Sequence, residues 1–155
     1  MAPSGDNAVV DPSLLAVLPA TVDGIAVAEY PTAEQAAARD ADLGRNVARI
    51  ATAFVGDAAG TNWAYTAVVD VRPEARNEAF YRDWQQTFDA SACERAGGVT
   101  GHTTVQIGGR SVERTACGGG LRTYHVRLEG TGILISVSDL GDKGFGQLEL
   151  AALRP

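Results

Sequence analysis

The chain has 155 residues, of which 45% are hydrophobic, and a formal net charge of −6. This length suits one domain with its own hydrophobic core, and the apolar content excludes wholesale disorder. The arginines are scattered among more numerous carboxylates, which excludes the basic stripe of a nucleic-acid-binding protein, and no apolar run is long enough to span a membrane.

Residues 1–12 are polar and rich in turn-forming residues, and we interpret them as a flexible leader to a single domain at residues 13–155. The chain does not open with the basic segment and apolar segment of a signal peptide. A polar start of this kind is consistent with an export signal or lipid anchor that precedes residue 1.

Three elements are expected between residues 12 and 56. Residues 12–19 form a short apolar helical turn that Pro19 ends, and residues 24–30 form a strand. A capping-box pattern at Thr32 and Gln35 begins a long helix. Apolar residues at helical spacing continue this helix to residue 56, and they are Leu43, Val47, Ile50, Ala51 and Phe54.

A strand and a second helix follow. Residues 62–71 alternate in the manner of a strand, and Pro73 begins a helix that continues to about residue 89. Phe80, Trp84 and Phe88 lie four residues apart on this helix. We expect this apolar stripe to pack against the core rather than to form an aromatic ligand site.

The region from residue 101 to residue 138 predicts a four-stranded antiparallel meander. Its strands lie at about 103–107, 110–117, 121–128 and 133–138, and glycine-rich turns separate them. With 107 opposite 110, 117 opposite 121 and 128 opposite 133, nine apolar residues share one face. That face consists of Val105, Ile107, Val112, Tyr124, Val126, Leu128, Ile133, Ile135 and Val137. The opposite face is polar and carries Thr104, Gln106, Glu113, Thr115, Thr123, His125, Arg127, Ser136 and Ser138.

These elements predict an α+β fold in which the four-stranded C-terminal meander and one or two N-terminal strands form an antiparallel β-sheet, with helices packed on one face. A short helix at residues 143–153 closes the chain. This layout of capped helix, long meander and closing helix is similar to that of PsbP-like domains, over residues 20–153. Small exported bacterial lipoproteins often carry such domains, and the resemblance implies a binding or assembly role rather than catalysis.

Cys93 and Cys117 are the only cysteines, and we expect them to form a disulfide that staples the second helix to the meander. Such a bridge indicates an extracytoplasmic compartment. The alternative is a cytoplasmic protein with two reduced thiols. The predicted register puts Cys117 on the polar face, so either the segment around residue 93 reaches that side or a bulge lies near Ala116.

His125 and its neighbours are the candidate ligand-binding residues. Glu113 faces His125 across the hairpin and Arg127 lies beside it, an arrangement that could orient the imidazole for acid–base work. The alternative is a solvated cross-strand polar pair. Arg114 falls on the apolar face and needs a partner, such as Asp70 or an anionic ligand, unless a bulge or an edge position returns it to water.

No catalytic, metal or cofactor motif is present, and the spacing of the cysteines and histidines matches no zinc site. We therefore expect a secreted or lipid-anchored soluble domain that binds an unidentified protein or small molecule without catalysis. The alternative is a small enzyme or ligand pocket centred on His125, Glu113 and Arg114. A concave pocket around His125 or Arg114 favours that alternative, and a flat, solvated His125 excludes it.

Overall fold

The computed structural model of the chain describes residues 7–154. The strands of its large sheet are β1 (Val9–Val10), β4 (Ala28–Glu29), β5 (Val47–Gly56), β6 (Trp63–Val71), β7 (Val99–Ile107), β8 (Arg110–Cys117), β9 (Arg122–Arg127) and β10 (Ile133–Leu140). A separate small hairpin consists of β2 (Thr21–Val22) and β3 (Ile25–Ala26). The α-helices are α1 (Pro31–Ala38), α2 (Ala41–Asn46), α3 (Glu78–Cys93) and α4 (Phe145–Ala151). Short 3₁₀ helices are η2 (Pro12–Val17), η3 (Pro73–Ala75), η4 (Glu94–Ala96) and η5 (Gly118–Gly120).

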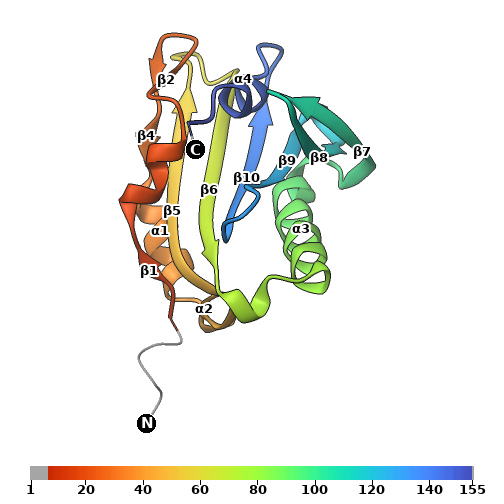
Figure 1. Cartoon of the computed structure of the whole chain (residues 1–155). Helices are drawn as coiled ribbons and strands as arrows, with labels where there is room; N and C mark the ends of the chain where they lie inside the picture. The colour runs from red at the N-terminus through yellow and green to blue at the C-terminus, as the bar shows by residue number, and fades with distance from the viewer. Residues whose placement is uncertain (1–6, 155) are drawn as a thin grey trace.

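The large sheet runs in the order β1-β5-β6-β10-β9-β8-β7, with β4 also paired to β5 (Figure 1). Only the β1–β5 pair is parallel among the described strands. The predicted α+β class is confirmed, and the sheet has more strands than expected because β1 and β5 join the two predicted N-terminal strands and the meander.

The predicted meander is confirmed in strand order and in register. Ile107 lies opposite Arg110, and the β8–β9 pairing has the predicted alignment, with Glu113 opposite His125. Leu128 N–H donates to the Ile133 carbonyl at 3.0 Å, which fixes the third hairpin as predicted. The nine residues assigned to the apolar face all belong to, or pack against, one hydrophobic core.

The prediction of a long helix up to residue 56 is wrong for the second half of that segment. The chain turns at α2 and continues as β5, and the helix that precedes it starts at Pro31, with Tyr30 rather than Thr32 as its cap. β5 is buried on both faces: Ile50 belongs to one core, and Ala51 and Val55 belong to the other. Apolar residues on both sides of a strand imitate helical spacing, which explains the error.

Residues 9–12 are part of the fold rather than of a leader. Val9 and Val10 pair in parallel with β5, and Asp11 accepts a hydrogen bond from Ser13 N–H at the start of η2. Asp11 also forms an ion pair with Arg49 at 2.8 Å. Residues 1–6 of the expected leader lie outside the described residues.

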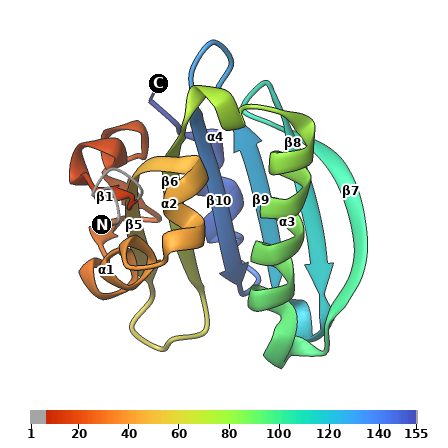
Figure 2. The ribbon, with the colours of Figure 1, turned by 90° about the horizontal axis from the view of Figure 1, so that it is seen from below.

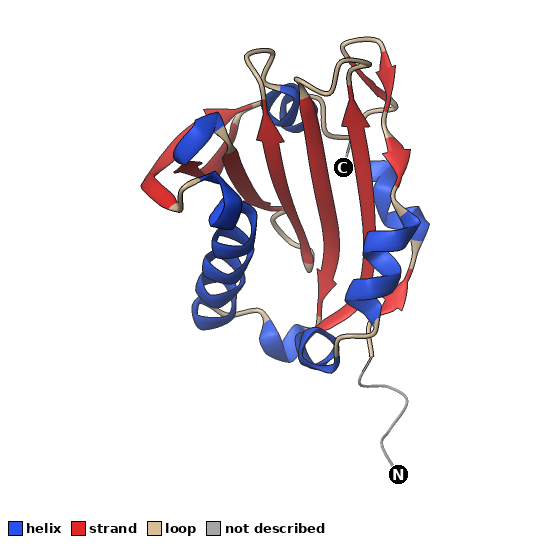
Figure 3. Ribbon diagram, turned by 180° about the vertical axis from the view of Figure 1, so that it is seen from behind, coloured by secondary structure: helices blue, strands red, loops and turns tan. Residues whose placement is uncertain are grey.

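Helices cover both faces of the sheet, not one. η2, the small hairpin and α4 pack on the apolar face of the meander, where Leu14, Phe145 and Leu150 are buried. α1, α2 and α3 flank the opposite face, and Trp84 packs there against a second core that contains Leu134. Seen from behind, the long strands run between α3 and the helices of the N-terminal part (Figure 3). In Figure 2, α3 lies over β9 and β8, and β7 forms the outer edge.

The disulfide links Cys93 and Cys117, whose Cα atoms are 5.2 Å apart. Cys93 is the last residue of α3, and this helix covers the polar face on which Cys117 lies. Of the two explanations offered by the sequence, the first holds, since the segment around residue 93 reaches that face. The only irregularity in the β7–β8 pairing lies on β7, between Val99 and Gly101.

Candidate functional site

His125, in the middle of β9, is buried between the sheet and α3. Its Nε2 lies 2.7 Å from Asp89 Oδ1 on α3, and its Nδ1 lies 2.7 Å from Ser136 Oγ on β10. The residue is only 6% exposed. The interpretation as a solvated cross-strand pair is therefore wrong, because α3 covers the polar face at this point.

Asp89 is the centre of the hydrogen bonding around His125. Thr123 Oγ1 donates to its Oδ1 at 2.5 Å, and Thr115 Oγ1 donates to its Oδ2 at 2.7 Å. Burial by itself raises the pKa of Asp89, but the hydrogen bonds from His125, Thr115 and Thr123 together outweigh burial and lower that pKa. The carboxylate is therefore held in its ionised form inside the fold.

Trp84 and His102 extend the network at its two ends. Trp84 Nε1 donates to Ser136 Oγ at 2.8 Å, and His102 Nδ1 lies 2.9 Å from Thr115 Oγ1. An indole N–H can only donate, so the hydroxyl proton of Ser136 is left for Nδ1 of His125. This pattern puts the proton of a neutral His125 on Nε2, where it faces the carboxylate.

Glu113 does not act as the partner of His125, although the two residues lie opposite each other in the β8–β9 pairing. The Glu113 carboxylate accepts a hydrogen bond from Thr104 Oγ1 at 3.2 Å instead. Sequence reasoning missed Asp89, but a signal was present. Asp89 precedes Cys93 by four residues, so both lie on the helix face that the disulfide turns toward the sheet.

Arg127 lies on the same face as His125, at the mouth of a small pocket. It forms an ion pair with Glu78 at 2.6 Å, and its guanidinium carbon lies 4.4 Å from the centroid of the Tyr81 ring. Both contacts come from α3 and hold the exposed arginine against the helix. Arg127 is thus attached to the first turn of α3 rather than to the imidazole.

Arg114 lies on the other face of the sheet and is half-buried. Asp70, which the sequence suggested as its partner, pairs with Arg49 at 2.8 Å. The charge of Arg114 acts instead on Asp139: burial raises the pKa of Asp139, and Arg122 and Arg114 partly offset that effect. The fold therefore does not bring Arg114 to the imidazole of His125.

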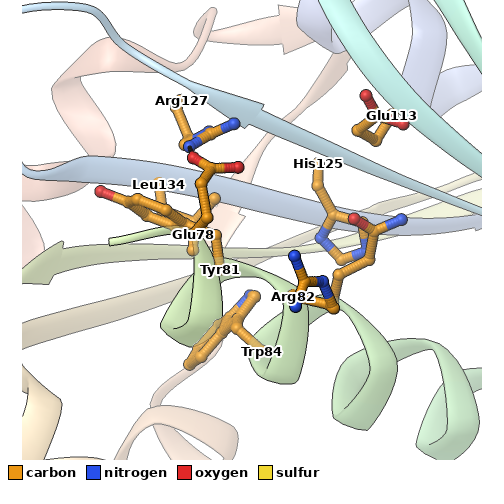
Figure 4. Close-up of a pocket in the computed structure, with 9 residues that line it drawn as sticks. Glu78, Tyr81, Arg82, Trp84, Glu113, His125, Arg127 and Leu134 are labelled. Atoms are coloured by element: carbon orange, nitrogen blue, oxygen red, sulfur yellow. Dashed lines mark hydrogen bonds and ion pairs between the residues drawn. The ribbon is translucent and has the colours of Figure 1, made fainter. Parts of the chain in front are cut away.

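The small pocket has a volume of about 190 Å³ and lies between α3 and the strands β8, β9 and β10. Figure 4 shows Glu78, Tyr81 and Arg127 together on one side of it and Glu113 on the other, with His125 between them. The full lining consists of Glu78, Tyr81, Arg82, Trp84, Gln85, Glu113, His125, Arg127 and Leu134. His125 therefore lines a concave pocket, although both of its ring nitrogens already have partners.

A larger groove continues from this pocket to the apolar face of the sheet. The β8–β9 pairing ends at Glu113 opposite His125. Beyond that pair, the β7–β8 turn leans toward the end of α4, where a side chain at Gly108 would lie 3.3 Å from Ala151. The two strands separate, and a groove of about 1200 Å³ opens between the hairpin, η2 and the β9–β10 turn.

Within residues 7–154, no three His, Cys, Asp or Glu side chains are arranged to hold a metal ion. Both cysteines of the chain are joined in the disulfide. In the same range, no helix has the length and apolar character needed to cross a membrane.

Comparisons with protein-family models, with curated proteins and with solved structures gave no match. The resemblance to PsbP-like domains thus stays a prediction from the layout of the elements.

Proposed function

We propose that this chain is a binding domain that works outside the cytoplasm and has no catalytic role. The observation that carries the proposal is the contrast between its two concave regions. The groove of about 1200 Å³ is open and partly apolar, whereas the histidine cluster beside it is closed by its own hydrogen bonds. Ligand sites in proteins are concave and combine apolar side chains with a few polar groups, and the groove has both kinds of side chain in its lining.

The closed histidine cluster argues against catalysis. A general base needs a ring nitrogen within reach of a substrate proton, and both nitrogens of His125 already have protein partners at 2.7 Å. Ser136 is fully buried on the middle of β10, so its hydroxyl is not placed to attack a substrate. The cluster is better explained as a polar core that fixes α3 on the sheet.

The compartment is inferred from the disulfide. A buried bridge between Cys93 and Cys117 is stable in an oxidising environment and uncommon in the cytosol. Titration of the denatured, non-reduced protein with a thiol reagent tests this part of the proposal. We expect no free thiol, and two free thiols per chain would contradict an extracytoplasmic location.

Binding in the groove is tested with the neutral fluorescent probe N-phenyl-1-naphthylamine. We expect saturable fluorescence enhancement with the wild-type chain. Ala16→Glu adds a long side chain at an exposed position of η2 that lines the groove, and it should abolish the enhancement. Ala36→Glu makes the same change at an exposed position of α1, away from the groove, and should leave it intact. Equal enhancement in all three proteins would contradict binding in the groove.

The enzymatic alternative keeps one supporting observation, since His125 lines a concave pocket and contacts a carboxylate. Hydrolysis of p-nitrophenyl acetate by the folded variants His125→Gln and His102→Gln separates the two interpretations. The His102 variant controls for ordinary imidazole reactivity. A rate that falls about tenfold or more in the His125 variant alone would favour catalysis over binding.

A further inference from the structure

We propose that the groove takes a single-chain amphiphile with an anionic head group, a carboxylate or a phosphate. This inference rests on the proposed binding function and names the class of ligand. It is based on the groove's apolar walls, on two arginines that have no carboxylate partner within residues 7–154, and on the contact between the segments that carry those arginines.

The apolar walls of the groove are the rim of the main hydrophobic core. Leu14 and Val17 line it from η2, and Leu128 and Ile133 line it from the β9–β10 end. Leu14 and Leu128 are buried members of that core, and Val17 and Ile133 are half-buried residues packed against it. The half-buried side chains leave apolar surface that an acyl chain can cover, which is the favourable part of binding.

The charges that line the groove are four arginines and two glutamates, in a chain with a net charge of −6. The arginines are Arg49, Arg110, Arg127 and Arg154, and the glutamates are Glu113 and Glu129. Asp11, Asp70 and Glu78 neutralise Arg49 and Arg127, so these two arginines add no net positive charge to the groove. An anionic head group is favoured instead by the arginines that lack a carboxylate partner in the described part of the chain.

Among the residues that the structure describes, two of the four arginines have no carboxylate partner. Arg49 is held by Asp11 and Asp70, and Arg127 is held by Glu78. By contrast, within residues 7–154 the Arg154 side chain donates only to the neutral carbonyl of Leu18. Arg110, within the described part of the chain, has no hydrogen bond or ion pair to its side chain. The charges of Arg154 and Arg110 are therefore the ones left for a ligand.

Arg110 and Arg154 come from segments that meet. The β7–β8 turn packs against the end of α4 at Gly108 and Ala151. Arg110 begins β8 immediately after this turn, and Arg154 follows α4 by three residues. Guanidinium groups bind carboxylate and phosphate through paired N–H donors, so the head group is expected on this side and the acyl chain along η2.

The remaining charges predict how the site can be tuned. Glu113 already accepts from Thr104, whereas Glu129 lies on the β9–β10 turn and lines the groove as a second carboxylate. A carboxylate near the head group repels it. Glu129→Gln should therefore strengthen binding of an anionic amphiphile, and Arg110→Gln should weaken it.

The test is displacement of N-phenyl-1-naphthylamine, with all ligands below their micelle concentrations. The ligands share one chain length: dodecanoate, dodecyl phosphate, dodecyltrimethylammonium and the neutral dodecyl maltoside. We expect each anion to bind at least about tenfold more tightly than the cation, with a difference that shrinks at high salt. Preference for dodecanoate or for dodecyl phosphate identifies which anionic head group the site takes, and either one supports the proposal.

Arg110→Gln should weaken binding of the anions about tenfold and leave binding of the neutral probe unchanged. Arg95→Gln, an exposed change on η4 outside the groove, should alter neither. If the cation binds as tightly as the anions, the inference of an anionic head group fails, while the proposed binding function stands. If an acidic peptide displaces the probe more readily than either anion, the ligand class is wrong. If the neutral probe itself does not bind, both proposals fail.

Discussion

Asp89 on α3 holds His125 on β9 at 2.7 Å, across the interface between helix and sheet. The helix contributes one carboxylate, and the sheet contributes His125, Thr115 and Thr123 around it. Since Cys93 lies one helical turn further on, α3 is attached to the sheet by a polar network and a disulfide at neighbouring positions. This end of the helix is therefore more firmly fixed than its start.

Replacement of Asp89 by Asn should destabilise the fold by about 2–3 kcal/mol. The buried groups of His125, Thr115 and Thr123 would lose the charged acceptor to which they bond. Urea unfolding at neutral pH measures the loss. Asp83→Asn, an exposed change on the same helix, should cost less than about 0.5 kcal/mol. Similar losses in the two variants would show that the network contributes nothing particular to stability.

The same carboxylate predicts a pH dependence. The hydrogen bonds hold the pKa of Asp89 below its ordinary value of 3.8. The stability that this ionised group contributes is fully present above the unfolded value, and it is lost as pH falls through the lowered pKa of the folded state. Unfolding followed below pH 4 should therefore show a steeper loss for the wild type than for Asp89→Asn. Parallel curves would contradict an ionised Asp89 in the native state.

The meander could be predicted because each of its determinants is local. The turn at Gly108 fixes the first hairpin, and alternation along the strands permits one register in which the apolar residues share a face. β5 could not be predicted in this way. Ile50 and Ala51 point into different cores, and a strand covered on both sides loses the alternation that identifies it.

The sequence predicted only part of the site, for a related reason. Glu113 opposite His125 follows from the register, and the register was right. Which polar residue contacts the imidazole depends on what covers the strand, and that is decided by the tertiary packing of α3. Asp89 and Ser136 come from elements far from His125 in sequence order, so no spacing rule relates the three.

Removal of the disulfide by Cys93→Ala with Cys117→Ala should destabilise the domain by roughly 3–4 kcal/mol, since the bridge closes a loop of about 25 residues. For a chain of this size that loss lowers the melting temperature by roughly 10 °C. Calorimetry of the wild type, with and without reductant, provides the comparison. If reduction alone leaves the melting temperature unchanged, the bridge does not stabilise the fold.

Glu149, on α4, provides a prediction at higher pH. Burial raises its pKa from 4.5 to about 7, against a lowering hydrogen bond from Thr66. Among the described side chains, its Oε2 is the one buried oxygen or nitrogen that lacks a hydrogen-bond partner. The carboxyl group is therefore favoured in its neutral form, and ionising it inside the fold costs free energy.

Because the folded pKa lies above the unfolded one, the contribution of Glu149 is fully present below about pH 4.5 and is lost as pH rises through about 7. Glu149→Gln keeps the shape and the acceptor for Thr66 but cannot ionise. We expect the variant to match the wild type near pH 4.5 and to exceed it by up to roughly 3 kcal/mol at pH 8. Glu94→Gln, an exposed change, should follow the wild-type curve throughout. A stability difference between Glu149→Gln and the wild type that stays constant with pH would mean that Glu149 titrates normally and that its burial does not act on its ionisation.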